Sequence, residues 1–164
     1  MDAESIQRAL EDTFDQAIVY HAFTDYMRDY EVIVHAVTHP LTGIRPAYLR
    51  YLFKYCAETH VISAVTAEAW RKSLDDRLID YECGRELDGY VWGIKRQNVY
   101  PGVHVKADST AARRWRDAIG IPFHEVRFDT NGHDLTLVFH DLEVSEVGPG
   151  YAPFVVPEPP ENSL

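Results

Sequence analysis

The sequence predicts an α+β fold, with a mainly antiparallel sheet of about six strands and two or three helices packed on one face of that sheet. Several runs alternate between apolar and polar residues, as half-buried strands do. Turn-like segments with proline and glycine separate most of these runs, and hairpins outnumber strand–helix–strand units, which is typical of antiparallel pairing. At 164 residues the chain is long enough for one domain with a sizeable core.

One helix and two strands are expected in the first third of the chain. The helix covers about residues 3–15, where apolar residues recur every four positions and form one stripe. The strands cover roughly 26–38 and 46–58, and the segment HPLTGIRP between them ends both, because it holds two prolines and a glycine. The helical stripe consists of Ile6, Leu10, Phe14 and Ile18.

The middle of the chain predicts two short helices separated by strands. Thr66 is the expected N-cap of a helix over about 66–76, and Ser109 is the expected N-cap of a helix over 110–119 that Gly120 ends. Strands are expected near 78–83, 89–95 and 103–106, with a turn at Tyr100-Pro101-Gly102. The tryptophans occupy apolar positions and are expected to be buried: Trp70, Trp92 and Trp115.

A β-hairpin is the most strongly predicted element near the end of the chain. The Asn-Gly pair at 131–132 supplies the residues that a two-residue hairpin turn favours. This turn places Phe128 opposite Leu135 on the core face and directs Arg127 and Thr136 away from it. The two strands cover roughly 123–129 and 134–144.

The second strand of this hairpin changes phase near its end. Apolar residues occupy odd-numbered positions through Phe139, whereas Leu142 and Val144 are even-numbered. A β-bulge or bend near His140 and Asp141 explains the change. Such an irregularity more often shapes the edge of a sheet than it re-aims a side chain at an active site. Beyond it, we expect the α+β domain (1–146) to give way to a proline-rich tail (147–164) that is extended or disordered.

The net charge of −10 is concentrated at the two ends of the chain. Residues 1–31 carry eight acidic and two basic side chains, and residues 141–164 carry five acidic and no basic ones. Nucleic acid is not an expected partner, because the chain lacks a basic footprint. The sequence shows no signal peptide and no apolar run long enough to cross a bilayer. We therefore expect a soluble cytoplasmic protein, without membrane association and with its oligomeric state open.

No metal and no cofactor are expected, although the chain has eight histidines. His124 and His140 fall on opposite faces of the predicted hairpin and cannot share an ion, and no HxH or HExxH pattern occurs. Cys56 and Cys83 are in no CxxC spacing, so both are expected to be reduced thiols. Glycine-rich phosphate loops and serine-nucleophile motifs are also missing from the sequence.

Two groups of polar residues are candidates for a site. Asp75 and Asp76 beside Arg77 could divide acid and base work, although adjacent carboxylates at a helix end usually face solvent. The stretch 95–127 is locally basic; it could hold a phosphate, and we favour the interpretation that it complements the acidic ends within the fold. The least poor catalytic candidates are Asp75, Asp76, Arg96 and Asn98.

Four runs of the sequence resemble the YxiG-like family of bacterial proteins. They are FTDYMRDYEVIVH (23–35), SLDDRLIDYE (73–82), GYVWGIKRQNVYPGV (89–103) and FHEVRFDTNGHDLTLVFHDLEV (123–144). The resemblance covers about residues 10–145. It assigns no chemistry and no functional residue. Because some members are encoded near polymorphic toxins, it implies an immunity or partner-binding role at most.

Three functional hypotheses follow from these observations. The first is a non-enzymatic protein-binding domain, of a toxin-immunity type, for a partner with a basic surface. The second is a small enzyme of unknown chemistry with a polar site near the four candidate residues. An interaction subunit without its own activity is the third. A deep pocket with converging polar groups favours the enzyme, whereas a flat acidic or aromatic surface favours the binding protein.

Overall fold

The computed structural model describes residues 1–24, 27–37, 40–43, 45–72, 97–148 and 151 of the chain. Its helices are α1 (Ala3–Glu11), α2 (Ala67–Lys72) and α4 (Thr110–Ile119), with a 3-10 turn, η1 (Pro40–Thr42). Its strands are β1 (Ala17–Phe23), β2 (Tyr30–Ala36), β3 (Ala47–Lys54), β4 (Glu58–Ser63), β5 (Gln97–Lys106), β6 (His124–Thr130), β7 (His133–Phe139) and β8 (Asp141–Val147). The predicted elements near 78–83 and 89–95 lie outside the described residues.

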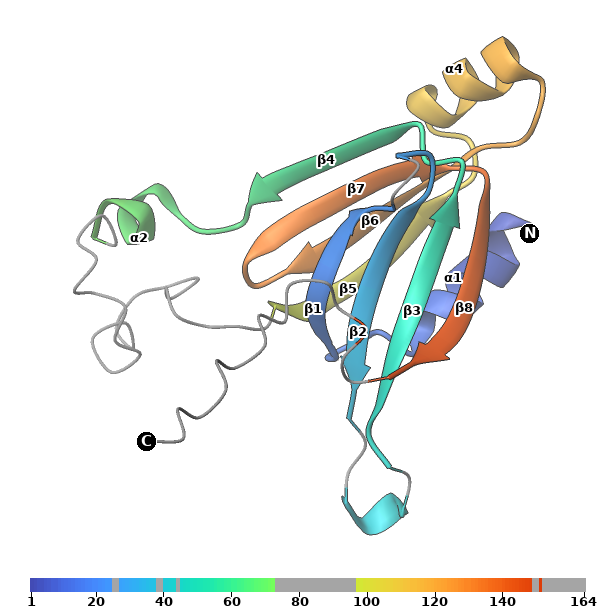
Figure 1. Cartoon of the computed structure of the whole chain (residues 1–164). Helices are drawn as coiled ribbons and strands as arrows, with labels where there is room; N and C mark the ends of the chain where they lie inside the picture. Colours follow the sequence, from blue (N-terminus) through green and yellow to red (C-terminus); the bar gives the residue numbers. More distant parts are fainter. Residues whose placement is uncertain (25–26, 38–39, 44, 73–96, 149–150, 152–164) are drawn as a thin grey trace, which may run out of the picture.

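The described strands form one antiparallel sheet in the order β4-β7-β6-β5-β1-β2-β3-β8. The sheet folds over into two layers, with β4, β7 and β6 in one and β1, β2, β3 and β8 in the other, and the strands of the two layers run in clearly different directions (Figure 1). The fold class is therefore confirmed, but the sheet has eight strands where we expected about six. The runs 46–58 and 134–144 each begin in one layer and end in the other, and the strand Ala17–Phe23 was not predicted.

Two corners carry the chain between the layers. At one corner Tyr55 adopts a left-handed backbone conformation (φ 50°) between β3 and β4. At the other, His140 separates β7 from β8, and its amide donates to the carbonyl of Lys54 at 3.0 Å. This confirms the predicted bend near His140 and Asp141. Beyond the bend Leu142 is buried, as expected, but Val144 is 43% exposed.

The main core lies between the two layers. The Phe53 ring on β3 meets the Phe128 ring on β6 and the Phe139 ring on β7 edge to face, at centroid distances of 5.9 Å and 4.8 Å. Ile6 and Leu10 of α1 belong to the same buried cluster. Edge-to-face aromatic pairs add to the free energy gained from burial alone. The core therefore joins elements that are far apart in the sequence.

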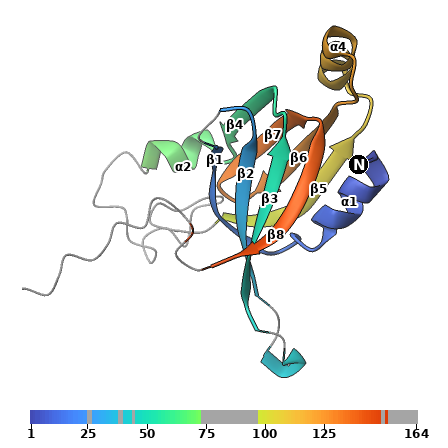
Figure 2. The same ribbon diagram turned by 45° about the vertical axis from the view of Figure 1, so that its right-hand side comes forward.

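The helices do not share one face of the sheet, which corrects the prediction. α1 adds its apolar side to the main core, whereas Ala112 of α4 packs with Phe123 and Val138 in a separate cluster. Val138 follows Leu137 on β7, and successive strand residues point to opposite faces. Because Leu137 belongs to the main core and Val138 does not, α4 packs on the side of this layer that faces away from the main core, and it extends beyond the ends of the strands (Figure 2).

The predicted hairpin register is confirmed from His124 opposite Phe139 to Phe128 opposite Leu135. Phe128 pairs with Leu135, and both side chains are buried, whereas Arg127 pairs with Thr136 on the other face. The helix over 110–119 is also confirmed: the Ser109 hydroxyl accepts from the Ala112 amide, and Gly120 ends the helix at φ 85°. Both features depend on residues close together in the sequence.

Two local expectations were wrong. The first helix ends at Glu11, and Thr13 follows it with both its amide and its hydroxyl bonded to the Leu10 carbonyl. Tyr100-Pro101-Gly102 is not a turn between elements; it forms an irregularity inside β5, where the register with β6 shifts between Val99 and Gly102. Proline lacks the N–H that a regular ladder needs, so inside a strand it is found at such bulges.

The tryptophans are less buried than predicted. Trp70 is 39% exposed, and its indole N–H donates to the Ser63 hydroxyl at 2.9 Å. Trp115 is half-buried against Phe123, at a centroid distance of 6.3 Å. Trp92 lies outside the described residues.

Candidate functional site

The structure places one of the four predicted catalytic candidates. Asn98 is exposed on β5. Its backbone N–H donates to the side-chain oxygen of Asn131 at 3.0 Å, and this hydrogen bond connects β5 to the hairpin turn. Asp75, Asp76 and Arg96 lie outside the described residues. The predicted polar site near these residues therefore stays a prediction.

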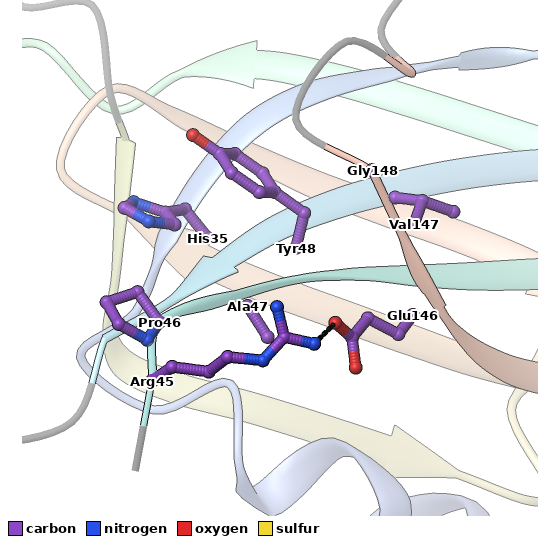
Figure 3. A pocket seen from close by; sticks show the side chains of 8 residues that line it. All are labelled: His35, Arg45, Pro46, Ala47, Tyr48, Glu146, Val147 and Gly148. Atoms are coloured by element: carbon purple, nitrogen blue, oxygen red, sulfur yellow. Dashed lines mark hydrogen bonds and ion pairs between the residues drawn. The ribbon is translucent and has the colours of Figure 1, made fainter. Parts of the chain in front are cut away.

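Two depressions open on the surface of the described residues. The first, of about 480 Å³, lies where β2, β3 and β8 end. In it the rings of His35 and Tyr48 stack at a centroid distance of 4.5 Å, and Arg45 donates to Glu146 at 2.7 Å (Figure 3). This ion pair is solvent-exposed and satisfies its own charges, so it provides no free charge to a substrate. The depression is lined by His35, Arg45, Pro46, Ala47, Tyr48, Glu146, Val147 and Gly148.

The second depression, of about 320 Å³, holds two ion pairs. Arg28 donates to both carboxylate oxygens of Asp29 at 2.9 Å, and this contact holds the pKa of Asp29 below its ordinary value. Arg50 donates to the buried Glu31 at 2.7 Å, and the Tyr151 hydroxyl donates to the same carboxylate at 3.0 Å. The depression is lined by Thr24, Arg28, Asp29, Glu31, Arg50, Leu52 and Tyr151. Its acids and bases neutralise one another, as in the first depression.

A row of polar side chains lies between β1 and the β6–β7 turn. His21 Nδ1 and the Tyr30 hydroxyl are 2.6 Å apart, and burial lowers the pKa of His21 while it raises the pKa of Tyr30 to about 12. The Gln97 amide contacts His133 Nδ1 at 3.1 Å.

Burial also raises the pKa of Cys56 to about 11. The thiol is therefore protonated at neutral pH, and a protonated thiol is a poor nucleophile.

The acidic residues of the two chain ends divide into paired and unpaired groups. Glu31 and Asp29 are buried against arginines, as described above. On β8, Glu143 pairs with Lys54 at 3.1 Å, and Glu146 pairs with Arg45. In contrast, none of the ion pairs in the described part of the chain involves three exposed acids at the end of α1, which are Glu11, Asp12 and Asp15.

Two exposed aromatic rings lie beside these unpaired acids. Phe14 is 53% exposed and Tyr100 is 63% exposed, although their ring centroids are only 6.1 Å apart. Phe14 stands in the short link between α1 and β1, and the bulge of β5 presents Tyr100 next to it. We call this surface the aromatic–acidic patch; it comprises Glu11, Asp12, Phe14, Asp15, Tyr100 and the exposed Pro101.

Backbone hydrogen bonds hold the patch in place. The amide of Phe14 donates to Glu11 at 3.2 Å, and the amide of Asp15 donates to the Val99 carbonyl at 2.8 Å. Asp15 has φ 58°, a left-handed conformation that aspartate tolerates better than most residues. The link is therefore ordered in the free protein, and binding there requires little further ordering of the backbone.

Within the described residues, three arginines of the predicted basic stretch pair with acids near them and not with acids of the two chain ends. Among the described residues, Arg114 of α4 pairs with Glu58, and Arg116 pairs with Asp108 and Asp117 at 3.2 Å. On the hairpin, Arg127 pairs with its neighbours Asp129 and Asp134. Each of these acids lies outside residues 1–31 and 141–164. These three arginines are thus neutralised locally, and no ion pair among the described residues involves the acids of the patch.

The described residues contain no group of three or more His, Cys, Asp or Glu side chains placed to hold a metal ion. His124 Nε2 is 3.1 Å from the Met1 carbonyl, and His140 Nδ1 is 2.6 Å from the Pro122 carbonyl. None of the described helices is long and apolar enough to cross a membrane.

Comparison with known families supports the resemblance noted in the sequence. The model of one family, described as YxiG-like protein, matches residues 2–157. The match includes all four runs that carry the resemblance, as well as the aromatic–acidic patch. No curated protein matches the chain.

Proposed function

The chain belongs to the YxiG-like family, and we propose that it is a non-enzymatic protein-binding domain whose aromatic–acidic patch receives a basic surface of a partner protein. The observation that carries this proposal is the exposed contact between Phe14 and Tyr100, beside carboxylates that have no ion-pair partner in the described residues. Adjacent exposed aromatic rings form a contiguous apolar surface, and such surfaces with a polar rim often mark protein interaction sites.

The chemistry of the patch fits lysine or arginine side chains. A cation over an exposed aromatic ring gains about 0.5–1 kcal/mol, and a nearby carboxylate adds a charge-assisted hydrogen bond. Tyrosine is enriched at binding hot spots because its ring is large and its hydroxyl can hydrogen-bond. The chain's net charge of −10 would also speed the encounter with a positively charged protein.

We further propose that the partner is a basic protein whose activity the chain blocks, as an immunity protein blocks a toxin. The family resemblance and the chemistry of the patch support this role. The alternative is a small enzyme with a site near Asp75, Asp76, Arg96 and Asn98. The depression with Arg45 and Glu146 and the depression with Arg28 and Asp29 hold charges that already neutralise each other, which favours binding over catalysis at these two places.

The proposal is tested by capture of partners from a lysate of the native host at low salt, with the wild type and a Phe14→Ala, Tyr100→Ala double variant. We expect a basic protein to bind the wild type, to bind the double variant at least 10-fold more weakly, because hot-spot truncations cost about 2 kcal/mol or more, and to dissociate as salt rises. Ile119→Ala is the matched control, because Ile119 is 52% exposed on α4 and lies outside the patch.

Two outcomes would reject the proposal. One is equal capture by the wild type and the double variant, which would place the binding surface elsewhere. The other is recovery of no partner together with turnover of a small metabolite in an activity screen, which would support the enzyme.

A further inference from the structure

The outer edge of β4 is unpaired in the part of the chain that the structure describes. β4 stands at the end of the strand order and pairs only with β7 (Figure 1). Its register with β7 runs from Glu58 opposite Val138 to Ser63 opposite His133. An unpaired edge presents a row of backbone donors and acceptors to another strand.

The phase of the β4–β7 ladder shows which residues face outward. The amide of Ala64 donates to the Gly132 carbonyl at 3.0 Å, directly beyond the last ladder pair. Backbone hydrogen bonds in an antiparallel ladder involve alternate residues. The even-numbered residues of β4 therefore bond to β7, and the N–H and C=O groups of Thr59, Val61 and Ser63 point away from it.

The side chains of β4 leave this edge open. Val61 is 46% exposed and Ile62 is 67% exposed, on opposite faces of the strand. β4 carries no lysine and no proline, which are devices that commonly protect sheet edges. Its single acid, Glu58, is already bonded to Arg114 and Trp115.

We propose that β4 pairs antiparallel with β4 of a second copy of this chain, with Val61 opposite Val61 of that copy. This inference does not depend on the aromatic–acidic patch. It is carried by the self-complementary order of the outward-facing residues, because a two-fold axis at Val61 places Thr59 opposite Ser63 of the second copy. A Thr–Ser pair can hydrogen-bond across strands, and two facing valines remove apolar surface from water.

The same register also creates no unfavourable contact between the even-numbered residues of the two strands. His60 comes opposite Ile62 of the second copy, and Glu58 opposite Ala64, so no two like charges face each other. An interface of this kind is isologous, and it joins the two sheets into one continuous sheet. A single six-residue edge buries less area than a standard interface, so we expect a dimer that dissociates on dilution.

The test is sedimentation velocity of the full chain over a concentration series. The wild type is expected to shift from monomer to dimer as concentration rises. Val61→Lys and Val61→Asp should each weaken association by about 10-fold or more, because like charges would then lie directly opposite. An equimolar mixture of the two variants should associate again, since lysine would face aspartate. Val144→Lys is the matched control: Val144 is as exposed as Val61, on the strand at the opposite end of the order.

Val61→Pro provides a second variant. It removes only an outward-facing N–H and leaves the ladder with β7 intact, so the variant should fold and stay monomeric. A wild type that stays monomeric at every concentration would overturn the proposal. The edge of β4 would then either pair with a strand of another protein or stay exposed to solvent. A dimer that forms equally well in Val61→Lys, or a mixture of the charged variants that fails to associate, would also overturn it.

Discussion

The indole N–H of Trp115 donates a hydrogen bond to the carboxylate of Glu58 at 2.5 Å and so fixes α4 to the first residue of β4. Arg114 and His60 contact the same carboxylate. Burial raises the pKa of Glu58, but the hydrogen bonds from Trp115, His60 and Arg114 outweigh burial, so its pKa is lower than usual. Glu58 is therefore ionised at neutral pH and acts as the shared acceptor at this corner of the sheet.

Trp115→Phe should lower the free energy of unfolding by about 1–2 kcal/mol, because it removes a donor to a charged acceptor while keeping a ring against Phe123. Trp70→Phe is the matched control. It removes an indole bond to the neutral Ser63 hydroxyl at a more exposed position and should cost about 1 kcal/mol or less. Urea denaturation measures both values. Equal costs for the two variants would mean that the charge of Glu58 contributes nothing.

Phe128→Ala should destabilise the protein by about 3–5 kcal/mol, because a fully buried ring is removed from the centre of the core. Arg127→Ala, one residue away, should cost about 1 kcal/mol or less, since its ion pairs with Asp129 and Asp134 are at the surface. Urea midpoints provide the comparison. A larger cost at Arg127 than at Phe128 would contradict the observed hairpin register.

The hairpin and α4 could be predicted because their signals are local. The Asn131-Gly132 turn sets every pair of the hairpin, and Ser109 and Gly120 set both ends of α4. The strand β1 was missed because Ile18 continues the four-residue spacing of the first helix, although it belongs to a strand. The spacing does not show that the chain leaves the helix at Glu11.

The aromatic–acidic patch could not be predicted, because its parts meet only through tertiary structure. Phe14 was placed in the apolar stripe of the first helix, and Tyr100 was placed in a turn; both expectations are wrong. The two rings come together because β1 pairs with β5, with Ala17 opposite Asn98. The one available signal was the excess of acids near Phe14, and it did not distinguish unpaired acids from those that arginines neutralise.

The free energy of unfolding should fall as the pH drops below about 6.5, in part because of His21. Burial lowers the pKa of His21 in the folded state from 6.5, so the unfolded chain binds the proton more readily. The stabilisation is complete above pH 6.5 and is lost as the pH falls toward the folded-state pKa. Asp29 and Asp141 also have lowered pKa values, but their contribution is lost only below about pH 4.

His21→Gln should flatten this dependence below about pH 6.5, since the amide can still bond to the Tyr30 hydroxyl but does not titrate there. His104→Gln, at an exposed position on β5 where Nε2 lies 3.7 Å from Asp129, provides the comparison for replacing a histidine outside the core. Urea denaturation at a series of pH values gives the slopes. Identical slopes for the wild type and His21→Gln would show that His21 does not contribute.

The purified protein should contain no stoichiometric transition metal. This expectation comes from the sequence, where no four ligands occur at a recognised spacing, and from the backbone contacts of His124 and His140. Elemental analysis measures the content. About one zinc per chain, lost on replacement of two histidines, would reject it.

The triple variant Glu11→Gln, Asp12→Asn, Asp15→Asn should bind the basic partner more weakly at low salt and should respond less to salt than the wild type. Each substitution removes a charge and keeps the shape, and asparagine also tolerates the left-handed backbone of Asp15. The wild type should lose affinity as salt rises, because exposed charges separated by more than about 8–10 Å are screened at moderate ionic strength. Titration of the captured partner at two salt concentrations measures the difference.

The matched control is Glu143→Gln, which removes an acid that already pairs with Lys54 and should change the salt response less. A triple variant with the salt response of the wild type would show that the patch does not supply the electrostatic attraction.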